Sequence, residues 1–91
     1  MHFAYVLENG NTKSLYIGYT TNIQRRIAEH KAGKSLHTRR HKADGEWNFI
    51  YCECYVNKKD ALGREKFLKG GSGRNYIKRQ LRHYFESNKV G

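Results

Sequence analysis

Three stretches of the chain, residues 3–8, 15–20 and 47–56, either alternate apolar with polar residues or are rich in β-branched and aromatic residues. Both patterns are typical of β-strands. Asn9-Gly10-Asn11 is a strong turn signal, so the first two strands are expected to form an antiparallel hairpin. Residues 47–56 are the most apolar stretch and are predicted to be the central strand, packed under helices.

Apolar residues spaced three and four apart predict three helices, at residues 23–32, 58–69 and 73–86. Asn22 and Asn57 stand at the N-cap positions of the first two. The Gly-rich segment 70–73 matches neither phosphate-loop pattern, and we expect it to end the second helix while Ser72 caps the third.

These elements predict one α/β (α+β) domain over residues 1–91. Its small three-stranded antiparallel sheet is expected to be flanked by about three helices, in the order β-β-α-β-α-α. The hairpin would bring Tyr5 and Tyr16 close together if register and faces agree. Gly18 is expected where the second strand gives way to the first helix.

The first helix carries two polar residues beside its apolar stripe. Arg26 lies three residues after Ile23, and His30 lies three after Ile27, so both flank the core-facing side. The plainer interpretation is an edge arginine with a buried stem and a satisfied helix histidine.

The second helix carries a carboxylate within its apolar stripe. Glu65 lies four residues after Ala61 and three before Leu68. Because an unpaired buried charge is costly, we expect Glu65 to meet Arg26, a metal ion or both. A purely structural ion pair between Arg26 and Glu65 is the alternative.

The charge balance favours a polyanion as partner. The 91 residues include 18 Lys and Arg against 8 Asp and Glu, a formal net charge of +10. Tyrosines among the basic residues fit nucleic acid better than a membrane surface. We expect the phosphate contacts to come from the polar loop and from the basic side of the third helix. The candidate residues are Lys34, Arg39, Arg40, Lys42, Lys78 and Arg79.

No basic lead followed by a long apolar run marks the chain for export, so a cytoplasmic protein is expected. Cys52 and Cys54 alternate along a strand and are predicted to be buried thiols on one face rather than a disulfide. A structural zinc site formed by these cysteines with His37 and His41 is an alternative, although the Cys-x-Cys spacing suits it poorly.

Taken together, these residues resemble the GIY-YIG nuclease domain, and more narrowly its small single-domain members similar to the incision domain of bacterial excision-repair nuclease. Tyr16-Ile17-Gly18 reproduces the second half of the family motif, and Phe3-Ala4-Tyr5 stands in place of the first half, with Phe3-Ala4 replacing Gly-Ile. Arg26 has the spacing of the family's catalytic arginine, and His30 matches a histidine found in some members. Glu65 matches the metal-binding glutamate.

The resemblance implies a divalent-metal-dependent endonuclease acting on DNA, with Mg²⁺ or Mn²⁺ on Glu65. It implies that Arg26 binds phosphate oxygens and that Tyr5 or Tyr16, with help from a neighbour such as His30, accepts or relays the proton of the attacking water. Asn75 is the nearest candidate for an asparagine that many members carry after the glutamate.

No appended recognition module is present in the sequence, so we expect structure-selective or weakly sequence-specific cleavage, with a protein partner for targeting. A non-catalytic nucleic-acid-binding module that keeps the fold is the alternative.

Overall fold

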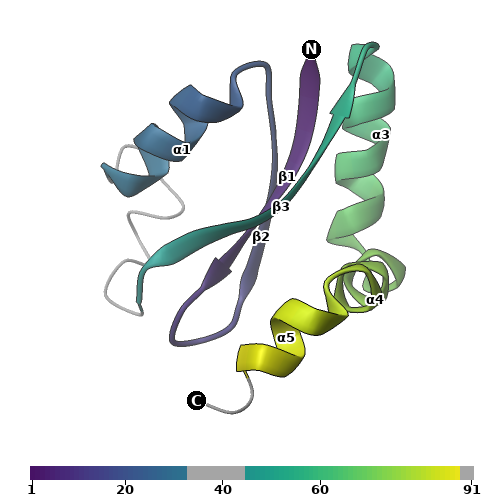
Figure 1. Ribbon diagram of the computed structural model, residues 1–91. Helices are drawn as coiled ribbons and strands as arrows, with labels where there is room; N and C mark the ends of the chain where they lie inside the picture. The colour runs from purple at the N-terminus through teal and green to yellow at the C-terminus, as the bar shows by residue number, and fades with distance from the viewer. Residues whose placement is uncertain (33–44, 89–91) are drawn as a thin grey trace.

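The computed structural model describes residues 1–32 and 45–88. Its strands form one antiparallel sheet in the order β2-β1-β3, with helices on both faces (Figure 1). The strands are β1 (His2–Asn9), β2 (Leu15–Thr20) and β3 (Trp47–Tyr55). The helices are α1 (Ile23–Lys31), α3 (Lys58–Lys69), α4 (Gly71–Gln80) and α5 (Arg82–Asn88). The predicted fold class is confirmed.

The central strand is β1, not the stretch predicted from its apolar content. β1 pairs with β2 on one side and with β3 on the other, and residues 4–9 are all buried. β3 is an edge strand whose residues are half-buried or exposed. The prediction was wrong because the apolar content of β3 comes largely from aromatic residues that pack on helices. Such packing does not require the strand to pair with a neighbour on both of its edges.

The two cysteines of β3 are exposed, so the prediction of buried thiols was also wrong. They share one face, as alternation requires, and lie opposite Tyr5 and Phe3 of β1. Helix α1 meets this face near the beginning of β3, where the rings of His30 and Phe49 are 5.8 Å apart. Cys52 and Cys54 lie further along the strand, and their side chains reach solvent.

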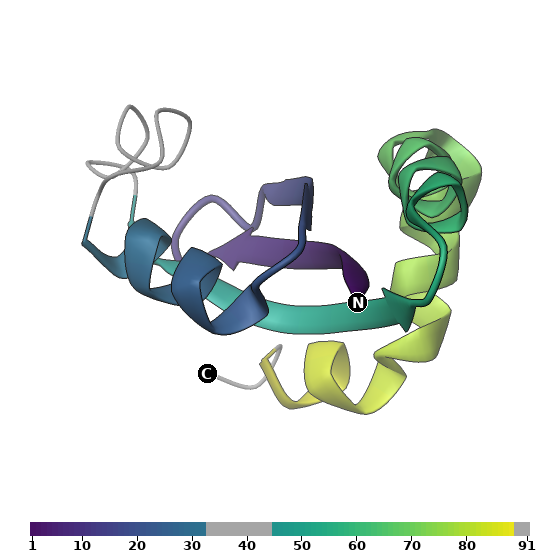
Figure 2. The same cartoon turned by 90° about the horizontal axis from the view of Figure 1, so that it is seen from above.

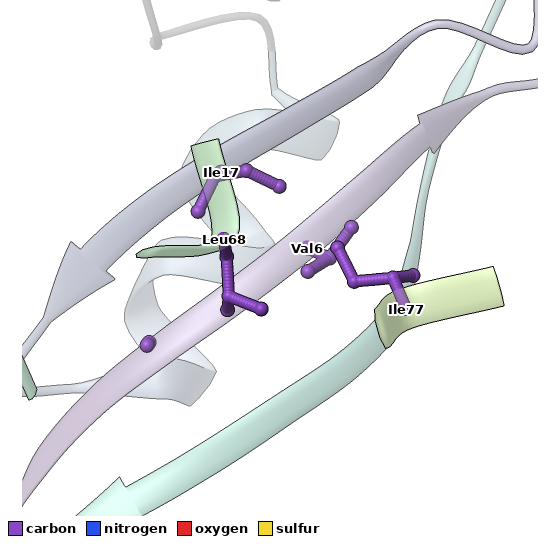
Figure 3. Close-up of a cluster of buried hydrophobic side chains, with 5 residues drawn as sticks. Val6, Ile17, Leu68 and Ile77 are labelled. Atoms are coloured by element: carbon purple, nitrogen blue, oxygen red, sulfur yellow. The ribbon is translucent and has the colours of Figure 1, made fainter. Parts of the chain in front are cut away.

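The hydrophobic core lies on the opposite face of the sheet, under α3 and α4 (Figure 3). Val6 of β1 and its partner Ile17 of β2 pack there with Leu68 of α3 and Ile77 of α4. Figure 2 shows α3 and α4 at a distance from α1, with α5 running back from them. The sheet therefore separates a core face from the face that α1 covers.

A polar network ties α3 to the edge strand. Arg64 donates from Nε and Nη2 to the two carboxylate oxygens of Glu53, at 2.8 and 3.1 Å. Tyr51 donates to Glu53 Oε2 at 2.5 Å, and Tyr55 donates to Oε1. The Arg64 guanidinium lies 4.3 Å from the ring centre of Tyr76. Burial raises the pKa of Glu53, but the hydrogen bonds from Arg64 and the tyrosines outweigh it and hold the pKa below its usual value.

The turn between α3 and α4 depends on Gly73. A Cβ at this position would lie 2.7 Å from the carbonyl carbon of Leu68 and closer still to the Phe67 oxygen and Leu68 Cα. Only glycine allows the backbones to approach this closely. Ser72 does not cap the helix as predicted: α4 begins at Gly71 with Gly70 as N-cap, and no side chain makes the capping bond.

The single helix expected over residues 73–86 is divided at Leu81, which gives the order β-β-α-β-α-α-α for the described residues. Leu81 has φ −108° and ψ 33°, outside the helical region. After this break the Tyr84 hydroxyl donates to Glu8 Oε1 on β1 at 2.5 Å. The break changes the direction of the chain where this contact to the sheet is made, and no glycine or proline in the sequence marks it.

No helix in the described part of the chain has the length and apolar character to cross a membrane.

Candidate active site

Tyr5 and Gly18 face each other across β1 and β2, on the α1 side of the sheet. A Cβ at position 18 would lie 2.9 Å from Tyr5 Cε1 and closer still to Cζ and the hydroxyl. The tyrosine ring therefore occupies the space left by the missing side chain. Gly18 lies within β2 rather than at its end, so its predicted location was wrong by two residues.

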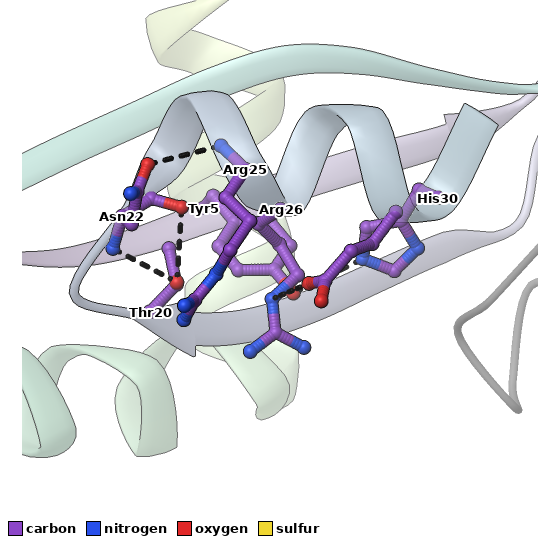
Figure 4. A network of polar contacts seen from close by, with 7 residues as sticks. Tyr5, Thr20, Asn22, Arg25, Arg26 and His30 are labelled. Atoms are coloured by element: carbon purple, nitrogen blue, oxygen red, sulfur yellow. Dashed lines mark hydrogen bonds and ion pairs between the residues drawn. The ribbon is translucent and has the colours of Figure 1, made fainter. Parts of the chain in front are cut away.

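His30 is the hydrogen-bonding partner of Tyr5. The Tyr5 hydroxyl lies 3.2 Å from His30 Nε2, and the two residues are only 1% and 7% exposed. His30 comes from the last turn of α1, whose first turn is held by Asn22: Asn22 Oδ1 accepts from the Arg25 N–H at 3.0 Å (Figure 4). The predicted N-cap is confirmed, and it fixes the helix that carries both Arg26 and His30.

Tyr16 and Phe49 complete an aromatic cluster around this hydrogen bond. The ring centres of Tyr5 and Tyr16 are 6.3 Å apart, so the predicted proximity of the two motif tyrosines is confirmed. The Tyr16 and His30 rings are 5.7 Å apart, and Phe49 stacks 5.2 Å from Tyr5. Tyr5 is buried beneath these rings, while Tyr16 is partly exposed.

Arg26 and Glu65 are not paired with each other among the described residues. Arg26 Nε lies 3.3 Å from Glu29 Oε1, and Glu65 Oε2 lies 3.4 Å from Lys69 Nζ. Arg26 Nε is buried, yet its contact with Glu29 lacks hydrogen-bond geometry. The predicted direct ion pair is absent because each residue finds an opposite charge on its own helix.

Both charges nevertheless act on Tyr5. Burial raises the pKa of the Tyr5 hydroxyl well above its usual value, and the neighbouring Tyr16 and Glu65 raise it further, while Arg26 lowers it. Tyr5 therefore remains protonated at neutral pH. In this state it can donate a hydrogen bond or relay a proton, but it cannot act alone as a strong base.

The candidate metal-binding residue is Glu65, whose side chain is 20% exposed. No group of three or more His, Cys, Asp and Glu side chains able to hold a metal occurs in the described ranges. A single carboxylate suits Mg²⁺, which keeps several waters and is held through one or two carboxylates and substrate phosphate. It does not suit structural zinc, which takes four protein ligands.

Only some of the residues predicted to contact nucleic acid belong to the part of the chain that the structure describes. Lys78 and Arg79 are exposed on α4, as is Asn75, which lies away from the residues in contact with Tyr5. The residues predicted from the polar loop lie outside the described residues, as do the two histidines of the zinc alternative: Lys34, Arg39, Arg40, Lys42, His37 and His41.

Two neighbours of the site were missed at the sequence level. Glu29 follows Arg26 by three residues, and this helical spacing could have identified it as the arginine's partner. Phe49 stacks on Tyr5 because Phe49 pairs with Leu7 across β1 and β3, a register that the sequence does not reveal.

Comparison with known proteins gives a consistent result. The family model for the GIY-YIG catalytic domain matches residues 1–82. A UPF0213 protein of Staphylococcus haemolyticus is 36% identical over 80 residues, which are 85% of this chain and 90% of that protein. A UPF0213 protein of Bacillus licheniformis is 34% identical over 84 residues, 89% of this chain and 84% of its own. A UPF0213 protein of Haloquadratum walsbyi is 35% identical over 68 residues, which are 75% of this chain and 73% of that protein. No solved structure matches the chain.

Proposed function

The chain belongs to the GIY-YIG catalytic domain family, a nuclease family, and we propose on this premise that it is a divalent-metal-dependent endonuclease hydrolysing phosphodiester bonds in DNA. The observation that carries the proposal is the hydrogen bond between Tyr5 and His30, enclosed by Tyr16 and within reach of the charges of Arg26 and Glu65. Phosphodiester hydrolysis needs a proton acceptor for the attacking water and positive charge for the phosphorane, and these residues supply candidates for both.

The two tyrosines have different parts in this proposal. Tyr16 is partly exposed and faces the substrate, whereas Tyr5 is 1% exposed and keeps its proton. In this proposal the proton of the attacking water passes to Tyr16 as Tyr16 gives its own phenol proton to Tyr5 and Tyr5 gives its proton to His30 Nε2, so each phenol regains a proton as it loses one. His30 is thus a positioning and relay residue behind the two phenols.

Arg26 is the proposed phosphate ligand. Its side chain is 33% exposed and its Nε makes no hydrogen bond, so the guanidinium retains donors for phosphate oxygens. A planar guanidinium binds two such oxygens at once, which an ammonium group does not reproduce. Glu29 holds the arginine before substrate binds.

Glu65 would hold Mg²⁺ or Mn²⁺, with water and phosphate as the remaining ligands. A bound divalent ion supplies Lewis-acid stabilisation of the phosphorane charge and of the leaving oxygen. The pairing of Glu65 with Lys69 is compatible with this role, because the lysine side chain is 57% exposed and can move into solvent.

The test compares the wild type with Glu65→Gln on labelled linear, flapped and branched DNA, with Mg²⁺, with Mn²⁺ and with chelator. Asp60→Asn is the matched control, since it neutralises an exposed carboxylate in the first turn of the same helix. We expect metal-dependent products from the wild type and Asp60→Asn, and none from Glu65→Gln. Binding of every substrate without cleavage by the wild type would favour a non-catalytic binding module instead.

A further inference from the structure

Three hollows that share lining residues lie around the hairpin end of the sheet and α5. The first, about 430 Å³, is lined by Phe49, which stacks on Tyr5, and also by Glu8 and Lys13. The second, about 370 Å³, shares Glu8 and Lys13 with the first and adds Arg74 and Phe85. The third, about 290 Å³, shares Lys78 and Phe85 with the second and adds Arg82. We call these three adjoining hollows together the basic groove.

Cationic side chains dominate the rim of the basic groove. Among the described residues that line it, the basic ones are Lys13, Arg74, Lys78 and Arg82. The two carboxylates along it are already engaged: Glu8 is buried and accepts from Tyr84 at 2.5 Å, and Glu86 lies 3.9 Å from Arg82. The rim therefore presents a net positive charge to a ligand.

The walls below this rim are apolar and aromatic. Leu15 and Phe85 line the second hollow, and Phe49 lines the first. A volume of about 370 Å³ falls within the ~300–1,000 Å³ range of small-ligand sites and accommodates an unstacked base. Basic side chains along a groove with aromatic surfaces are the arrangement that binds single-stranded nucleic acid, whose bases stack and whose phosphates pair with the rim.

We propose that the basic groove binds a single-stranded arm of the substrate. The occupant is argued from the charge complementarity of the rim and from the aromatic walls, and Phe49 lines the first hollow while its ring stacks on Tyr5. This inference rests on the proposed nuclease function and specifies its substrate class: DNA with a single-stranded flap or overhang. A continuous duplex has its bases paired and cannot place one of them against Phe85.

The test measures binding without cleavage, in chelator and on the Glu65→Gln background, so that loss of turnover does not affect it. The probes are a fluorescent 15-nucleotide single strand, a blunt duplex, and the same duplex with a single-stranded arm. The groove variant is Arg74→Gln with Lys78→Gln. The matched control is Lys58→Gln with Lys59→Gln, which removes the same charge from exposed residues in the first turn of α3.

We expect the groove variant to weaken binding of the single strand and the armed duplex at least about tenfold, and to lower the slope of log affinity against log salt by about 1.4, since each lost phosphate contact on a single strand contributes ~0.7. The control should stay within twofold of its parent. Thermal melts of both variants within a few degrees of the parent exclude unfolding as the cause.

Equal losses in the groove variant and the control would overturn the proposal, because charge alone would then explain the binding. Equal losses on blunt and armed duplexes would overturn it as well, since the groove would not distinguish the arm. If the preference for single-stranded arms is intact but the wild type cleaves no substrate under any condition, the groove proposal stands and the nuclease proposal is wrong.

Discussion

Gly18 leaves room for Tyr5: the tyrosine ring lies where a side chain on the opposing strand would project, and a Cβ there would come within 2.9 Å of Cε1 and nearer to the hydroxyl. The ring cannot be displaced without breaking its hydrogen bond to His30. The second glycine of the family motif thus sets the position of the first tyrosine.

Gly18→Ala is expected to lower the rate of DNA cleavage at least about tenfold, because a displacement of about 1 Å can cost up to ~100-fold. It should also destabilise the fold by about 1–3 kcal/mol through overpacking. Single-turnover cleavage and thermal melting measure the two effects. Gly63→Ala is the control: nothing lies within 4 Å of a Cβ at that helical position, so stability should rise by about 0.5–1 kcal/mol with activity unchanged.

Gly73→Ala is expected to destabilise the protein by about 3 kcal/mol or more, because the added methyl group meets backbone atoms of Phe67 and Leu68 that cannot rotate away. Urea denaturation measures the change. At Gly71, two residues earlier, a Cβ meets nothing within 4 Å, so Gly71→Ala should change stability by less than about 1 kcal/mol. Similar losses at both positions would contradict the close approach of α3 and α4.

Alkaline pH should weaken the fold partly through Tyr5. Its pKa is raised in the folded state, so its contribution to the free energy of unfolding is complete below pH ~10 and is lost as the pH rises through the folded pKa. Urea denaturation between pH 9 and 11 should give a steep decline for the wild type and a shallower one for Tyr5→Phe. Part of the decline in the free energy of unfolding should persist in Tyr5→Phe, because the pKa values of Tyr51 and Tyr55 are also raised. Identical slopes would argue against a buried phenol at position 5.

Glu53→Gln is expected to destabilise the protein by about 1–3 kcal/mol at pH 7, since it removes charge-assisted hydrogen bonds from Arg64 and the two tyrosines. The pKa of Glu53 is depressed in the folded state, so its stabilising effect is present above pH ~4.5 and lost as the pH falls through the folded pKa. The difference between the wild type and Glu53→Gln should therefore shrink in denaturant titrations toward pH 3. A constant difference would show that packing rather than ionisation is responsible.

Local patterns predicted most elements and the hairpin that holds the two tyrosines. Alternation along residues 3–8 and the Asn-Gly-Asn turn predicted this hairpin, because a hairpin is a local structure, and the observed register places Tyr5 near Tyr16. Asn22 and Asn57 cap their helices as predicted, since capping depends on neighbouring residues alone.

The errors concern contacts between distant segments. Which strand is central depends on where β3 docks, and its apolar residues do not specify that. The break at Leu81 accompanies a hydrogen bond between Tyr84 and Glu8, 76 positions apart. A pairing of Arg26 with Glu65 was one expected outcome, because Glu65 lies within an apolar stripe where an unpaired charge is costly. Instead, Glu29 and Lys69 supply an opposite charge to each of them on its own helix.

The exposed thiols of β3 make the catalytic face accessible to chemical labelling without any engineered residue. Cys52 lies opposite Tyr5 and Cys54 opposite Phe3, both reaching solvent. Partial desolvation and the neighbouring Cys54 and Glu53 raise the pKa of the Cys52 thiol, so a maleimide dye reacts faster there toward alkaline pH. Under the proposed function, a fluorophore attached to this strand would report on DNA that binds near Tyr5.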